Sequence, residues 1–251
     1  DRTAPATREM GRDNTGTADT ASQPGAYWNP AILGFRENTN YTLNADKRDL
    51  DRMGGNAGIE TKVGNRMGVG FAMLYRGDLA FDVVNEDDET VGTATPYFTM
   101  MYLGFAYRAT RRDAFGLSLS MSYDNLDISE HMEGYEVVDD YRSPVTINLG
   151  WLRQWNNNWS TSVVIRNLSF SENLSAKWDR NTSTDNTLPS TEGVRPKILQ
   201  IGLGYRSHIL GKPVYAWMEA IDYQVADTLL AFDPQLHVWT GRVGFECDII
   251  E

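Results

Sequence analysis

The segment Phe115–Asp124, FGLSLSMSYD, alternates strictly between large apolar residues and small or polar ones. The side chains of successive residues in a β-strand point to opposite faces. This segment therefore predicts a strand with one apolar and one polar face. Its apolar face comprises Phe115, Leu117, Leu119, Met121 and Tyr123.

The same alternation recurs along the chain, for example in MGVGFAMLY from residue 67 and LQIGLGYR from residue 199. Many of the segments exceed the usual strand of about 5–6 residues, and they suit a tilted membrane crossing of about 9–11 residues. The pattern predicts about ten strands, near residues 39–50, 56–64, 67–84, 97–110, 115–128, 145–155, 159–172, 197–208, 213–226 and 235–249.

The connections between these strands alternate between short and long. The short ones are Gly64–Arg66, Arg111–Asp113, Asn156–Asn158 and Leu210–Lys212, and the long ones are polar stretches near residues 85–89, 130–140 and 177–194. Outer-membrane barrels have short periplasmic turns and longer external loops. The sequence therefore predicts an all-β fold, an antiparallel transmembrane β-barrel with its acidic loops outside.

Aromatic residues gather near both ends of the predicted strands, as in the two interfacial girdles of a membrane barrel. Tyr107, Phe115, Trp155, Trp159 and Tyr205 lie near the short turns, and Tyr75 and Tyr123 lie near the long loops. A soluble β-sandwich would also show alternation, because it buries one face of each sheet. A soluble, secreted binding module that stacks its aromatics on sugars therefore remains an alternative.

The composition narrows the class of protein. The 251 residues carry a formal net charge of −11, which argues against nucleic-acid binding. The mean hydropathy is −0.44, and no run of about 18 apolar residues predicts a transmembrane helix. The single cysteine, Cys247, has no internal disulfide partner. The first residues do not resemble a signal peptide, which fits a processed chain or one never exported.

A short motif before the first predicted strand suggests a family. The stretch GAYWNPAILGF, Gly25–Phe35, contains Asn29-Pro30-Ala31. In this motif the chain resembles the FadL-type superfamily of outer-membrane long-chain fatty-acid transporters, and within it the PorV branch of type IX secretion. The resemblance implies that residues 1–36 form a plug or hatch inside the lumen of a barrel made by residues 37–251.

Two properties of the residues fit such a plug. Pro30 fixes its own φ and biases the preceding residue toward extended structure, although Asn-Pro could also be a plain turn signal. The side chains predicted to face the lumen are unusually small, with glycine at positions 68, 70, 150, 202 and 204. Because the family's barrels have fourteen strands, we expect an incomplete chain, and a smaller closed barrel is the alternative.

Charged residues also fall on the polar face of the predicted strands. Such charges are tolerated in a lumen, whereas arginine or lysine at mid-depth on the lipid face costs about 2–4 kcal/mol. We expect a salt-bridge network that holds the plug, or else a selectivity ring. The residues are Arg76, Arg166, Arg206, Arg242 and Glu246, with Glu219 or Asp222 expected to join them.

Neither catalysis nor a cofactor is expected. The strongest catalytic candidate is His131 beside Glu130 or Glu133, but a histidine in an acidic loop is normally solvated. Carboxylates at Asp87–Glu89 or Asp139–Asp140 could bind Ca²⁺, yet no EF-hand spacing and no Cys/His cluster occur, so no metal site is predicted.

The predicted location is a bacterial outer membrane, with the bilayer, lipopolysaccharide and other envelope proteins as partners. We expect a docking or structural component of a secretion or surface-assembly machine, contacting partners through Trp178, Leu229, Leu230 and Phe232. The alternative is a passive transporter of hydrophobic or small solutes. Docking predicts a filled lumen and apolar loop tips, whereas transport predicts a continuous apolar pocket from the loops to the plug.

Overall fold

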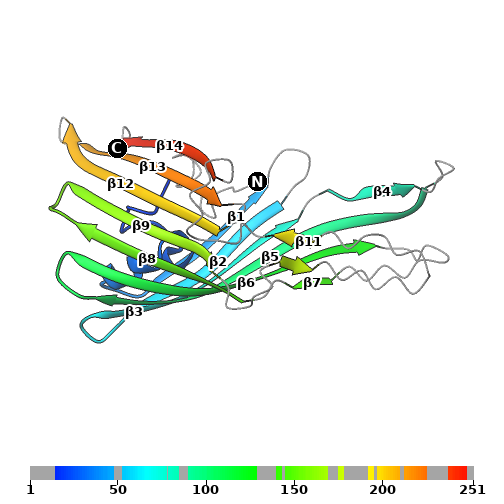
Figure 1. Cartoon of the computed structure of the whole chain (residues 1–251), viewed down its shortest axis with the longest axis horizontal. Coiled ribbons are helices and arrows are strands. Elements are labelled where there is room, and N and C mark those ends of the chain that lie inside the picture. The colour runs from blue at the N-terminus through cyan, green and yellow to red at the C-terminus, as the bar shows by residue number, and fades with distance from the viewer. Residues whose placement is uncertain are drawn as a thin grey trace.

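The computed structural model contains one large antiparallel sheet in which ten long strands follow each other in chain order (Figure 1). The structure describes residues 15–47, 53–77, 79–84, 90–128, 140–142, 145–168, 175–177, 192–194, 197–209, 212–224 and 237–247. The ten strands are β1 (Asn40–Lys47), β2 (Met53–Val63), β3 (Met67–Gly77), β5 (Thr90–Arg108), β6 (Asp113–Ile128), β8 (Thr146–Gln154), β9 (Trp159–Leu168), β12 (Lys197–Ile209), β13 (Lys212–Gln224) and β14 (His237–Cys247).

Shorter elements complete the described part of the chain. Strand β4 (Phe81–Val84) pairs with β5, and β7 (Asp140–Arg142) pairs with β6. Strands β10 (Ser175–Lys177) and β11 (Glu192–Val194) form a separate two-stranded sheet. Helix α2 (Gly25–Trp28) and the 3₁₀ helix η1 (Pro30–Phe35) precede β1. Within these residues, no helix is both long and apolar enough to cross a bilayer.

The predicted order of strands is confirmed, and so are the short turns at Gly64–Arg66, Arg111–Asp113 and Asn156–Asn158, whereas residues 210–211 of the fourth lie outside the described residues. Adjacent strands pair antiparallel, and the β2–β3 turn contains Gly64 at φ +62°, a left-handed value that glycine adopts without strain. In the β5–β6 turn, the hydroxyl of Thr110 accepts hydrogen bonds from the N–H groups of Arg112 and Asp113. Short side chains that bond the local backbone stabilise such turns.

The predicted strand boundaries were wrong near residue 90. The predicted strand 67–84 is interrupted between β3 and β4, and β5 begins at Thr90 rather than near residue 97. Phe81 lies opposite Ala94 in the β4–β5 pairing, so this hairpin extends toward the predicted acidic loop. Alternation is weak in TVGTATP, Thr90–Pro96, because small and β-branched residues stand at both odd and even positions of this stretch. Cross-strand pairing, which the sequence does not reveal, extends the strand.

The sheet is apolar on its outer face and polar on its inner face. Exposed side chains on successive strands include Leu43, Phe71, Leu103, Leu149, Ile201, Met218 and Phe245. Buried polar side chains on the opposite face include Thr42, Asn56, Ser118, Asn148, Ser162 and Gln200. A soluble sandwich has the reverse polarity, because its apolar faces pack together. The soluble β-sandwich alternative is therefore wrong, and the barrel polarity is as expected.

The N-terminal segment, residues 15–36, lies inside the curve of the sheet. Figure 1 shows this dark-blue segment between the front strands β8, β9 and β12 and the rear strands β2 and β3. It contacts the sheet where glycine removes a side chain. An ideal Cβ on Gly116 would lie 2.2 Å from the carbonyl carbon of Pro30, and one on Gly68 would lie 2.0 Å from the carbonyl oxygen of Leu33.

We predict opposite outcomes for one substitution at two glycines. Gly116→Ala places a methyl group on the backbone of Pro30 and Ala31, so it should destabilise the fold by about 1–3 kcal/mol. Gly241→Ala meets nothing within 4 Å and should leave stability unchanged or raise it slightly. The measurement is the temperature at which the compact, heat-modifiable form is lost in detergent. Equal transition temperatures for both variants would contradict this account.

Candidate functional site

The end of the N-terminal segment is fixed by an ion pair between Arg36 and Glu60 of β2. Both side chains are buried, and Arg36 Nε donates to Glu60 Oε2 at 2.6 Å. The remaining guanidinium nitrogens donate to the carbonyl oxygens of Thr20 (2.7 Å) and Ser22 (2.6 Å). The N–H of Gly25 donates to the other Glu60 oxygen. The two buried charges thus bind each other and three backbone groups of the N-terminal segment.

The start of the segment is held by Glu219 of β13, which is 1% exposed. Its Oε1 accepts hydrogen bonds from the N–H groups of Gly16 and Thr17, both at 2.8 Å, and from the Thr17 hydroxyl at 2.7 Å. Gln200 of β12 donates to the other oxygen. Hydrogen bonds to a carboxylate are among the stronger ones in proteins, so this side chain anchors the first residues of the segment.

A third charged side chain, Arg166 of β9, binds the middle of the segment. Its guanidinium donates to the carbonyl oxygens of Tyr27 and Trp28, and it lies 5.4 Å from the centroid of the Tyr27 ring. These are the last carbonyls of helix α2, which lack partners within the helix. The lumen position predicted for Arg166 therefore brings it to the N-terminal segment.

The predicted motif Asn29-Pro30-Ala31 starts the 3₁₀ helix η1. Asn29 Oδ1 accepts from the N–H of Ala31 at 3.0 Å, and Pro30 occupies the first helical position, where an N–H is not needed. Asn29 Nδ2 donates to the carbonyl oxygens of Thr17 (3.0 Å) and Trp151 of β8 (3.2 Å). The asparagine therefore ties the helix to the wall of the sheet and to an earlier turn of its own segment.

The segment leaves the interior beside Glu37, which is exposed at the short-turn end. Lys62 and Arg108 each donate a hydrogen bond to its carboxylate at 3.0 Å. These bonds, followed by the positive charge of Lys62, hold the pKa of Glu37 below its usual range. Because Glu37 is solvated, this pair contributes far less to stability than the buried pair of Arg36 and Glu60.

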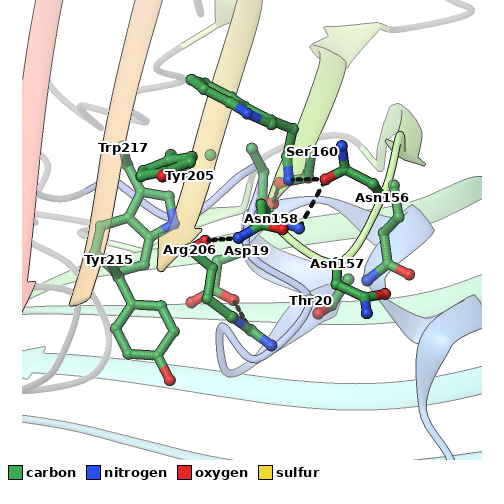
Figure 2. A pocket seen from close by; sticks show the side chains of 14 residues that line it. Asp19, Thr20, Asn156, Asn157, Asn158, Ser160, Tyr205, Arg206, Tyr215 and Trp217 are labelled. Carbon is green, nitrogen blue, oxygen red and sulfur yellow. Dashed lines mark hydrogen bonds and ion pairs between the residues drawn. The ribbon is translucent and has the colours of Figure 1, made fainter. Parts of the chain in front are cut away.

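A cavity of about 200 Å³ lies at the short-turn end, between the N-terminal segment and the wall (Figure 2). Its walls come from residues 18–20, the β8–β9 turn at Asn156–Asn158, and strands β12 and β13. Tyr215 and Trp217 are stacked with ring centroids 5.6 Å apart. The guanidinium of Arg206 lies 5.1 Å from the Tyr215 centroid and 3.9 Å from Asp19 Oδ1.

The other predicted lumen charges lie on the inner-face positions of their strands. Arg242 of β14 lies opposite Glu219 in the strand register, Glu246 lies opposite Tyr215, and Arg76 of β3 lies opposite Phe98. Arg166 and Arg206 contact different parts of the N-terminal segment. A selectivity ring stays a prediction.

Sequence reasoning missed Arg36, Glu60 and Asp19 as interior groups. Glu60 lies in β2, MGGNAGIETKV, whose glycines and small residues conceal the period of two. Arg36 and Asp19 precede the first strand, where no period exists. Only burial in the folded structure identifies these three side chains as interior groups, because arginine and carboxylate side chains are otherwise mostly exposed.

Several predicted residues lie outside the described part of the chain. These are Trp178, Leu229, Leu230 and Phe232 of the predicted partner-contact loops, the histidine candidate His131 with its two glutamates, and the Ca²⁺ candidates Asp87–Glu89 and Asp139. Among the described residues, no group of three or more His, Cys, Asp or Glu side chains is arranged to hold a metal ion.

We predict that Glu60→Ala loosens the N-terminal segment without unfolding the sheet. Removing one partner of a buried ion pair costs about 3–5 kcal/mol, here leaving Arg36 and the N–H of Gly25 without their acceptor. Amide hydrogen exchange of residues 15–36 should accelerate by on the order of 100- to 1,000-fold, while that of β5 and β6 stays slow.

The matched control is Glu37→Ala, which removes an exposed carboxylate near the same end of the segment. It should change exchange by less than about fivefold, because exposed pairs contribute about 0–1 kcal/mol. If both variants accelerated exchange equally, the buried pair would not be the anchor.

Comparison with known proteins yields matches by structure only. No protein-family profile and no curated protein sequence matches this chain. The toluene transporter TbuX of Ralstonia pickettii is 11% identical over 94% of this chain and 78% of its own, with a TM-score of 0.54. The toluene transporter TodX of Pseudomonas putida is 12% identical over 94% of this chain and 77% of its own, with a TM-score of 0.48.

A FadL homologue of Pseudomonas aeruginosa is 9% identical, covers 96% of this chain and 95% of its own, and has a TM-score of 0.36. At these identities a likeness concerns the fold, and the argument rests on TbuX alone. The expected barrel fold agrees with it, whereas these matches show neither the FadL-type superfamily nor its PorV branch for this chain. The chain therefore has the all-β barrel fold of the TbuX transporter.

Proposed function

We propose that this chain forms an outer-membrane barrel for the passive passage of small, largely apolar solutes, with residues 15–36 as a plug in its lumen. The observation that carries the proposal is the fold shared with TbuX, which is a toluene transporter. The transporter alternative from the sequence thus has better support than the docking role expected first.

The polarity of the sheet supports the membrane location. Apolar side chains cover the outer face from β1 to β14, where lipid would contact them. Aromatic side chains mark both ends of this band. Tyr75, Tyr97 and Tyr123 form a row on β3, β5 and β6, with centroids 6.2 and 6.1 Å apart. Trp159 and Tyr205 form a close pair, 4.5 Å apart, at the short-turn end.

The contacts of the plug suggest where a solute passes it. Buried carboxylates fix Gly16, Thr17 and Gly25. Residues 18–20 between them contact the wall through a hydrogen bond from Ser160 to the Ala18 carbonyl (2.6 Å) and the 3.9 Å approach of Arg206 to Asp19. The cavity of about 200 Å³ lies at this place, and its lining combines polar groups of Asp19, Arg206 and the β8–β9 turn with the rings of Tyr215 and Trp217.

A docking role would need features of the loop tips. The apolar candidates for partner contact lie outside the described residues. The filled interior agrees with the docking role expected from the sequence, so the proposal of transport rests on the fold shared with TbuX.

The test is uptake of labelled toluene by intact Gram-negative cells that express the chain with its natural leader. Apolar solutes cross the lipopolysaccharide leaflet slowly, so the barrel should raise the initial rate several-fold over cells without it. Asn157→Trp, which places a large ring at the mouth of the cavity, should reduce the gain by at least half.

Asn65→Trp is the matched control, since it makes the same change in another exposed turn at the same end of the barrel. It should leave uptake unchanged. All proteins are first checked for heat-modifiable migration, which reports the folded barrel. Correctly inserted wild-type protein that gives no gain in uptake would overturn the proposed function.

A further inference from the structure

Four arginines follow one another along the short-turn end of the sheet. They come from adjacent turns and strand ends, because the N–H of Arg108 bonds the carbonyl of Arg66 (2.7 Å) and the N–H of Gln154 bonds the carbonyl of Arg112 (2.8 Å). We call this row the arginine rim; it consists of Arg66, Arg111, Arg112 and Arg153. The first three are exposed, and Arg153 is 36% exposed.

The carboxylates near the rim leave it positively charged. Glu37 is already bonded to Lys62 and Arg108, and Asp113 lies 3.4 Å from Arg153. Thr110 also donates to Asp113, at 2.8 Å. The guanidinium groups of the three exposed arginines have no carboxylate within 4 Å among the described residues. Their charges are therefore available to an anionic ligand.

Aromatic rings hold two of these cations at the edge of the apolar face. Arg66 Nη1 donates to the hydroxyl of Tyr107 at 3.3 Å, and the guanidinium of Arg153 lies 4.2 Å from the Trp155 ring centroid. Tyr107, Trp155 and the neighbouring Phe115 are each about half exposed on the outer face. Cationic groups thus lie directly beside exposed apolar surface.

We infer that the arginine rim binds the phosphate groups of anionic phospholipids in the adjoining leaflet. Guanidinium groups bind phosphate oxygens with paired, charge-assisted hydrogen bonds. In such a complex the acyl chains would cover the apolar outer face that begins at Met67, Phe105 and Phe115. The inference rests on the membrane location in the proposed function, and it adds a lipid site with an assigned headgroup chemistry.

A lipid fits this surface better than an acidic protein does. An acidic protein could neutralise the arginines, but it would leave the adjacent rings and aliphatic side chains in contact with water. A phospholipid carries a phosphate and hydrocarbon chains in one molecule. Its phosphate can contact the arginine rim while its chains contact the adjacent apolar outer face. Exposed aromatic side chains also prefer this interfacial level of a bilayer.

The test is native mass spectrometry of the full chain in detergent with added dioleoyl phosphatidylglycerol or dioleoyl phosphatidylcholine. The wild type should retain phosphatidylglycerol in preference to phosphatidylcholine. Each arginine near an anionic surface contributes roughly a fivefold factor. The triple variant Arg66→Gln, Arg111→Gln, Arg112→Gln should therefore lose preference by up to about 100-fold at low salt, and added salt should weaken the wild-type preference.

The charge-preserving variant with lysine at the same three positions is the control. It should keep most of the preference, which a role confined to turn structure would not predict. Equal retention of both lipids by the wild type, or an undiminished preference in the folded glutamine variant, would overturn the inference. So would displacement of bound phosphatidylglycerol by poly-glutamate at equal charge concentration, because it would favour an acidic protein partner.

Failure of this inference is distinguishable from failure of the proposed function. Toluene uptake with no lipid preference would remove only the arginine rim as a lipid site. A lipid preference without toluene uptake would leave the rim in place and remove the transport role.

Discussion

The interior of this barrel depends on buried charges whose partners are backbone groups of another part of the chain. Glu60, Arg166 and Glu219 belong to the wall, and each binds N–H or carbonyl groups of the N-terminal segment. A charge taken out of water without such partners costs several kcal/mol. The dependence is mutual, because helix α2 ends in the carbonyl groups of Tyr27 and Trp28, and Arg166 of the wall binds both. Wall and segment therefore form one structure.

Small residues make that arrangement sterically possible. Positions 68, 116 and 150 on the inner face are glycines, and an added Cβ there would lie 2.0–2.2 Å from atoms of the segment. The segment's backbone thus packs directly on the strands at Gly68 and Gly116, and the Asn29 side chain does so at Gly150. The outer face has the opposite requirement, so leucine, methionine, phenylalanine and isoleucine alternate with these glycines and with the polar residues. One alternating sequence serves a polar interior and an apolar exterior.

The fold class could be predicted because a period of two is local information. Phe115–Asp124 shows it completely, and the structure places Phe115 outside and Ser118, Ser120 and Ser122 inside. The start of β5 could not be predicted, since Thr90–Pro96 has residues suited to either face and becomes a strand by pairing with β4 and β6. Asp19, Arg36 and Glu60 were missed because a buried carboxylate and a solvated one look alike in sequence.

The sequence by itself determined most of the long strands, their two faces and the short turns, because neighbouring residues control each of these. It also marked Asn29-Pro30-Ala31 as a special segment before the first strand. Only the tertiary structure decided which wall residues that segment contacts. Gly16 and Glu219 are 203 positions apart, yet joined by a 2.8 Å hydrogen bond. Such contacts follow from the curvature of the sheet around the segment, and no local pattern of residues specifies that geometry.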